Sequence, residues 1–155
     1  MTGRFLVHLA PPTLMDNHIK VVVWNVCALN SKAKRIAVRT VIASTSPLVV
    51  CLQETKLSLV TPTLVFETLG ASFADFYFLP AVGTRGGILL AWHSNTIAVA
   101  NPTIRTYHIS ATVSSLSGSD TWWITGVYEP QSGPDKLAFL TELDDLRESI
   151  AGPWV

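Results

Sequence analysis

Short apolar runs and one amphipathic stretch organise the first third of the chain. Residues 20–25 and 48–52 are nearly continuous apolar runs rich in valine, which is typical of strands buried on both faces. Between them, Asn30-Ser31 offers a helix N-cap. Apolar residues then recur at helical spacing, at Ala33, Ile36, Ala37, Val41 and Ile42. Strand, helix and strand in this order predict a parallel βαβ unit.

The remainder of the chain alternates between strands and turn residues. Thr61-Pro62 opens a short helix that ends at Gly70. We expect strands over 73–79, 88–92, 97–100, 104–113 and 121–128. A last helix begins at Ser132-Gly133-Pro134 and stops before Gly152-Pro153. Its expected apolar side consists of Leu137, Leu140, Leu143 and Leu146. Residues 1–18 show no period and carry two adjacent prolines, so we expect a disordered leader before one partial domain over 19–155.

Composition adds one constraint to this pattern. Of 155 residues, 48% are hydrophobic and 14% charged, against about 25% charged in average domains. The chain therefore either spans a membrane or buries a face against something else. Its apolar runs fall short of the roughly 20 residues that a spanning helix needs, so no membrane association is expected. The first apolar run is too short for a secretory signal, which favours an intracellular setting, with the nucleus as one option.

Two polar residues follow the strands of the predicted βαβ unit. Asn25 ends the first strand, and Glu54 comes just after the second. Ligand sites in open α/β sheets gather at the carboxyl ends of such strands. A carboxylate held there suits Mg²⁺, and a neighbouring amide can orient it, a metal-bound water or a phosphate oxygen. The alternative is that both residues simply cap strands in solvent.

The order of four motifs resembles a known superfamily. Trp24-Asn25 after a valine-rich strand, then Gln53-Glu54-Thr55-Lys56, is similar to the opening of endonuclease/exonuclease/phosphatase proteins. The resemblance is strongest to endonuclease domains of non-LTR retroelements, particularly the plant type. Thr84-Arg85-Gly86-Gly87-Ile88 and Val127-Tyr128-Glu129-Pro130-Gln131 resemble two later motifs, so the likeness covers about residue 19 to the end.

This resemblance implies a fold and a site. The fold is a four-layer α/β/β/α sandwich, of which this chain would supply the first half as one mixed sheet with flanking helices. The implied metal ligands are Glu54 and Asn25, and the implied catalytic residues are Asn25, Glu54 and Tyr128, with Tyr128 contacting the scissile phosphate. Mg²⁺ is the implied cofactor and DNA the implied partner.

Departures from the family pattern point to lost activity. Cys27 and Ala28 stand where relatives have arginine and glycine, which removes a cation and matters if position 28 needs a positive φ. Glu129 would repel a phosphate. The sequence ends on Gly152-Pro153-Trp154-Val155, which resembles the approach to a Gly-Asp-x-Asn motif. We therefore expect a truncated, inactive Mg²⁺-dependent endonuclease-like domain of retroelement origin, with magnesium bound weakly or not at all.

Two alternatives remain open at the level of sequence. One is a non-catalytic interaction module that binds protein or nucleic acid, and the other is a Mg²⁺-dependent phosphatase of the same superfamily. Lys32, Arg35 and Lys56 are candidates to contact nucleic-acid phosphates, although a basic helix face is more often just solvated. If the partner sheet is missing, the bared face predicts self-association or a protein partner.

Overall fold

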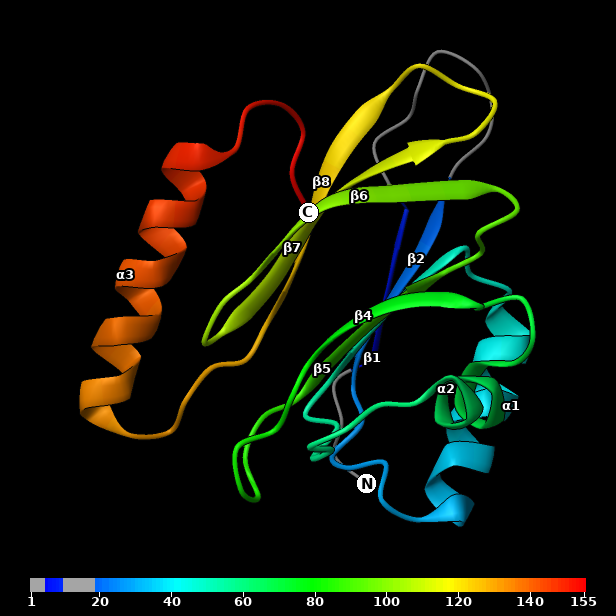
Figure 1. Ribbon diagram of the computed structural model, residues 1–155, viewed down its shortest axis with the longest axis horizontal. Helices are drawn as coiled ribbons and strands as arrows, with labels where there is room; N and C mark the ends of the chain where they lie inside the picture. The colour runs from blue at the N-terminus through cyan, green and yellow to red at the C-terminus, as the bar shows by residue number, and fades with distance from the viewer. Residues whose placement is uncertain (1–4, 10–18) are drawn as a thin grey trace.

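Two β-sheets and three helices make up the computed structural model, which describes residues 5–9 and 19–155. One sheet has five strands in the order β1-β2-β3-β5-β4, and the other has three in the order β6-β7-β8 (Figure 1). The strands are β1 Phe5–Leu9, β2 Lys20–Asn25, β3 Val49–Gln53, β4 Asp75–Leu79, β5 Ile88–Trp92, β6 Ile97–Ile104, β7 His108–Ser115 and β8 Thr121–Val127. The helices are α1 Lys32–Thr45, α2 Pro62–Leu69 and α3 Gly133–Ser149.

The predicted βαβ unit is confirmed. Strands β2 and β3 pair in parallel, with Asn25 opposite Gln53 at their carboxyl ends. Helix α1 connects them and begins at Ser31, whose hydroxyl accepts a hydrogen bond from the Lys34 backbone at 3.3 Å. Helix α2 likewise begins at the cap residue Thr61 and ends at Gly70. Local capping chemistry therefore sets both helices where the sequence predicts them.

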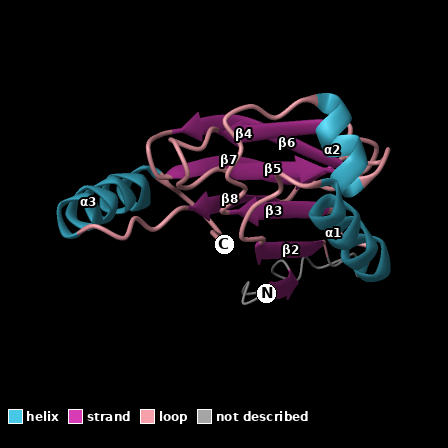
Figure 2. Ribbon diagram, turned by 90° about the horizontal axis from the view of Figure 1, so that it is seen from below, coloured by secondary structure: helices cyan, strands magenta, loops and turns pink. Residues whose placement is uncertain are grey.

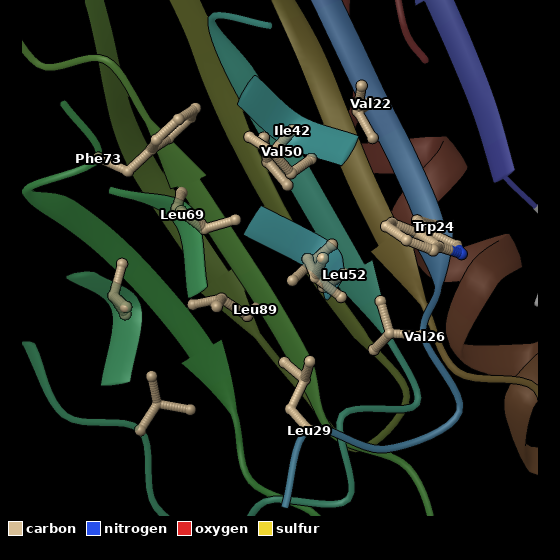
Figure 3. Close-up of a cluster of buried hydrophobic side chains, with 14 residues drawn as sticks. Val22, Trp24, Val26, Leu29, Ile42, Val50, Leu52, Leu69, Phe73 and Leu89 are labelled. Atoms are coloured by element: carbon tan, nitrogen blue, oxygen red, sulfur yellow. The ribbon is translucent and has the colours of Figure 1, made fainter. Parts of the chain in front are cut away.

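Helices α1 and α2 lie side by side over one face of the five-stranded sheet (Figures 1 and 2). Because side chains alternate along a strand, Val50 and Leu52 of β3 point to these helices, whereas Val49 and Cys51 point to the opposite face. Figure 3 shows the resulting core, in which Val50 and Leu52 meet Ile42 and Leu69 from the helices. Both faces of β3 are thus buried, which explains its continuous apolar run.

The opposite face of the five-stranded sheet is covered by the second sheet. Ile109 and Ala111 of β7 and Ile124 of β8 pack there against Cys51 and its neighbours. The prediction that the later strands continue the first sheet, and that one face of this sheet is left bare, is therefore wrong. The mixed α/β class with flanking helices is confirmed, but the chain encodes three strands of the partner sheet. Self-association through a bare inner face loses its structural basis.

Helix α3 lies on the opposite side of the molecule from α1 and α2, and it contacts the start of β7 (Figures 1 and 2). The Tyr107 and Phe139 rings meet edge to face at 5.9 Å, and His108 Nδ1 lies 2.7 Å from Glu142 Oε1. The expected apolar side of α3 is confirmed only in part: Leu146 is buried and Leu143 half-buried, but Leu137 and Leu140 are exposed and Phe139 is buried instead. Apolar residues occur all around this helix, so its period alone cannot select the buried face.

The structure differs from two further predictions, one about the first strand and one about β6. Residues 5–9 of the expected leader form β1, antiparallel to β2, because the outer edge of β2 offers hydrogen-bonding partners to an extended segment. The remainder of the leader lies outside the described residues. Strand β6 continues to Ile104 through a register shift after Ala100, so the expected break near residue 101 is absent.

None of the helices in the described ranges is long and apolar enough to cross a bilayer.

Candidate functional site

The loops after β2 and β3 remain paired beyond the ends of their strands. Val26 N donates to Gln53 O at 3.0 Å, and Ala28 N donates to Glu54 O at 2.8 Å. Asn25 and Glu54 are therefore held on neighbouring segments at one edge of the sheet. This is the convergence that the sequence predicts from the ends of two parallel strands.

A third loop, formed by Gly86-Gly87, closes on the same segment. Thr55 N donates to Gly87 O at 3.1 Å, and Lys56 N donates to Gly86 O at 3.0 Å. Gly87 has a φ of +89°, and a β-carbon on it would lie 2.3 Å from Thr55 Oγ1. The pair of glycines is therefore required for this approach, because no larger residue fits between the loops.

Tyr128 joins the cluster from the second sheet. A β-carbon on Gly86 would lie 3.2 Å from Cδ1 of the Tyr128 ring, so the ring rests directly against the glycine backbone. The Gln53 amide adds a second link between the sheets by donating to Val127 O at 3.0 Å. All four motifs singled out in the sequence thus meet at one end of the molecule.

Residues with strained, positive φ values cluster in the loops after β2 and β3. Cys27 and Ala28 have φ values of 52° and 99°, and Glu54 and Lys56 have 59° and 60°. Non-glycine residues rarely adopt this left-handed region, and each costs about 1–3 kcal/mol. Such residues cluster at functional sites, where surrounding contacts hold them. The positive φ that a glycine would suit at position 28 is present, although alanine stands there.

The polar groups of the candidate metal site are already engaged. Asn25 Oδ1 accepts hydrogen bonds from Cys27 N at 3.2 Å and from Cys27 Sγ at 3.3 Å. The Glu54 carboxylate forms an ion pair with the Lys56 ammonium, and both side chains are about one quarter exposed or less, at 20% and 27%. Lys56 therefore neutralises the carboxylate that the sequence assigns to a metal.

This donor set does not fit a resident magnesium ion. Mg²⁺ prefers near-octahedral oxygen ligation, with one or two carboxylates among its ligands. The site supplies one carboxylate, which Lys56 neutralises, and one amide oxygen that already accepts two hydrogen bonds. Among the described residues, no three histidine, cysteine, aspartate or glutamate side chains gather as a metal site.

The three candidate phosphate-binding cations have different environments. Arg35 is structural: Nε contacts Glu67 Oε2 at 3.1 Å, and Nη1 donates to the Leu29 and Asn30 carbonyls at 2.8 and 3.2 Å. Lys56 lies at the site itself. Lys32 is exposed at the start of α1. The predicted basic face thus serves in part to tie the loop after β2 to the helices.

A pocket of about 190 Å³ opens next to Tyr128, and the sequence reasoning missed it. Arg85, Tyr107 and Asp135 line it beside Tyr128. Partial burial and the nearby negative charges of Asp135 and Glu142, with Tyr128, raise the pKa of Tyr107. Arg85 lies within the glycine motif and could have been noticed. The approach of α3 to β7 follows from no local pattern.

No family model matches the chain, and no curated protein matches it. Several solved structures match the chain. The human Nocturnin catalytic domain with bound sulfate matches with a TM-score of 0.62 and 17% identity, over 95% of this chain and 63% of that one. A humanized D. rerio TDP2 matches with a TM-score of 0.58 and 15% identity, over 84% and 58%.

Two further structures extend this comparison. AP endonuclease LMAP from Leishmania major matches with a TM-score of 0.54 and 23% identity, over 83% of this chain and 46% of that one. D. rerio TDP2 with a single-strand DNA product gives 0.55 and 14%, over 85% and 55%. The chain has the endonuclease/exonuclease/phosphatase fold. It spans less than two thirds of the length of each of these proteins, and at such identities the likeness concerns the fold.

Proposed function

We propose that this chain is an endonuclease-like domain of the retroelement type, which binds the phosphodiester backbone of a nucleic acid but does not cleave it alone. The observation that carries this proposal is the meeting of Asn25, Glu54, Gly86 and Tyr128 at one end of the two sheets. The retroelement origin rests on the order of the four sequence motifs. Neighbours with this fold include a nuclease and a protein solved with a DNA product.

Binding follows from the donors that face this end. Lys56 keeps 27% of its side chain exposed and can contact a phosphate while it balances Glu54. The Tyr128 hydroxyl makes no hydrogen bond within the described residues and can donate to a phosphate oxygen. Lys32 adds an exposed cation at the start of α1. These groups recognise a charged backbone without reading its sequence.

Cleavage needs more than these groups provide. An attacking water must lose a proton, and the charge that develops on phosphorus must be stabilised at the same time. The three histidines in the described part of the chain lie elsewhere: His8 of β1 is paired with Val21 of β2, His93 lies against Phe73 and His108 against Glu142. Because groups that act together lose nearly all activity when one is missing, we expect no cleavage by this chain alone.

Magnesium binding is expected to be weak for the same structural reason. A divalent ion must displace the Lys56 ammonium from Glu54 and compete with Cys27 for the Asn25 oxygen. We expect a dissociation constant in the millimolar range or weaker. Calorimetric titration with MgCl₂ measures it, and a micromolar constant would contradict this interpretation of the ion pair.

The ion pair also favours one of the alternative functions. A carboxylate neutralised by a lysine from its own loop suits a non-catalytic module that binds nucleic acid. The ion pair between Glu54 and Lys56 is therefore the contact on which an enzyme and a binding module can be distinguished.

Two measurements test the proposal together. Supercoiled plasmid with Mg²⁺ should show no nicking above the Glu54→Ala control. A fluorescein-labelled oligonucleotide in about 50 mM salt should bind, and its affinity should fall with added salt because phosphate contacts release counterions. Lys56→Gln should weaken binding several-fold. Nicking that Glu54→Ala abolishes would show an active enzyme, whereas no binding at low salt would refute the backbone site.

A further inference from the structure

The pocket next to Tyr128 lies between the two sheets and helix α3. Its volume is about 190 Å³, below the roughly 300–1,000 Å³ of pockets for drug-sized ligands. It therefore has room for a single ring system. The residues that decide its chemistry are Pro80, Arg85, Tyr107, Tyr128, Pro130 and Asp135.

Its two tyrosines come from neighbouring strand ends and are held from behind. Tyr128 N donates to Tyr107 O at 2.8 Å, which fixes their separation. The Tyr107 ring meets Phe139 at an interplanar angle of 84°, and the Tyr128 ring rests on Gly86. Two aromatic side chains supported in this way form a preorganised wall for a flat ligand.

The charges around the pocket indicate which part of a nucleotide enters it. Asp135 lines the pocket, and one of its carboxylate oxygens accepts a hydrogen bond from the Ser132 hydroxyl. A carboxylate repels a phosphate but accepts a hydrogen bond from the N–H groups of a base. Arg85 is exposed and has no ion-pair partner in the described part of the chain, so it can meet the adjoining phosphate.

The pocket adjoins the proposed backbone site through shared residues. Tyr128 and Gly86 line the pocket, and Gly86 O accepts a hydrogen bond from Lys56 N beside Glu54. A strand whose phosphate lies at Lys56 and Tyr128 thus brings a base to the pocket mouth. A paired base could enter only after unpairing, which costs a few kcal/mol. The preferred ligand is therefore single-stranded.

We propose that the pocket between Tyr107 and Tyr128 receives one unpaired nucleobase of a single-stranded nucleic acid. The base stacks on tyrosine, Asp135 accepts one of its N–H groups, and Arg85 contacts the neighbouring phosphate. This inference rests on the proposed function, because the backbone must bind beside Lys56 for the base to reach the pocket.

Fluorescence polarisation with three probes of equal length tests this inference. The probes are a single-stranded oligonucleotide, its duplex, and a single strand with abasic positions at its centre that keeps every phosphate. The intact single strand should bind at least several-fold more tightly than the other two. Tyr107→Leu should remove most of this several-fold advantage and leave the affinity for the abasic probe unchanged. Tyr107→Phe should keep the advantage, because stacking needs the ring and not the hydroxyl.

Two other variants separate the pocket from the backbone site. Lys56→Gln should weaken all three probes alike. Asp135→Asn has the same shape as the native side chain, so it keeps the fold even if Tyr107→Leu does not. It should lower the affinity ratio between the intact and abasic probes several-fold. Equal binding of intact and abasic strands would overturn the base pocket while leaving the backbone site standing. Loss of all binding would refute both.

Discussion

Gly87 approaches Thr55 so closely that a β-carbon on the glycine would lie 2.3 Å from the threonine hydroxyl oxygen. Thr55 is fully buried and its backbone N–H donates to Gly87 O at 3.1 Å, so neither residue can move away easily. This contact joins the loop after β3 to the loop before β5. It explains physically why a glycine precedes the core strand that begins at Ile88.

Gly87→Ala should therefore destabilise the fold strongly. The φ of +89° costs an alanine about 1 kcal/mol or more, and the overlap with Thr55 adds about 1–3 kcal/mol. Gly83→Ala is the matched control, because Gly83 has a φ of +60° but a β-carbon on it would meet no atom within 4 Å. Urea denaturation measures both. Equal losses for the two variants would show that backbone strain, and not the contact with Thr55, is decisive.

Ala28→Gly should instead stabilise the protein. Ala28 has a φ of 99°, which strains an alanine but not a glycine. We expect a gain of about 1 kcal/mol in the free energy of unfolding. The same substitution at the exposed helical position Ala33 should cost about 0.5–1 kcal/mol. Opposite signs for identical substitutions would identify conformation as the cause, whereas a loss at both positions would contradict the strain at Ala28.

The sequence predicts those features that depend on local chemistry. Ser31 and Thr61 cap the helices as expected, and the valine-rich runs become strands buried on both faces. The predicted division between strands at residues 101–103 is wrong, because β6 runs through Pro102 to Ile104. The structure tolerates this proline on an edge strand, where its missing N–H costs little, next to Asn101 in a left-handed conformation.

The site could be predicted in position but not in its interactions. Asn25 and Glu54 follow strand ends, so their neighbourhood is set by topology. Whether a side chain pairs with Lys56 or stays free depends on rotamers that no sequence period encodes. The same limit applies to His108 and Glu142, which are 34 positions apart and meet only when α3 folds back onto β7.

The two cysteines should differ sharply in reactivity. Burial raises the pKa of the Cys51 thiol to about 12, and Cys51 lies in the core between the sheets. Cys27 is exposed in the loop after β2. Because the thiolate is the reactive form, iodoacetamide should modify Cys27 in the native protein and Cys51 only after denaturation. Mass spectrometry distinguishes them, with Cys27→Ser as the control. Native labelling of Cys51 would mean that the two sheets separate in solution.

Stability should fall as the pH drops, in part through His93. Burial lowers the pKa of His93 below its ordinary value of 6.5, and its ring meets Phe73 edge to face at 4.5 Å. The unfolded chain therefore binds a proton at a higher pH than the folded chain does, so stability rises with pH through this range. Above about pH 6.5, His93 does not lower the free energy of unfolding. As the pH falls from there towards the lowered pKa of His93, proton uptake by the unfolded chain destabilises the fold.

His93→Gln isolates this contribution from the other titrating groups. The substitution removes the ionisable ring but keeps the backbone, whose N–H donates to Leu48 O at 2.9 Å. Urea denaturation at a series of pH values between about 8 and 5 should show a smaller loss of stability in the variant than in the native sequence. The difference should appear below about pH 6.5, where the unfolded histidine takes up its proton. Parallel curves for the two proteins would show that His93 remains as easily protonated in the folded state as in the unfolded one.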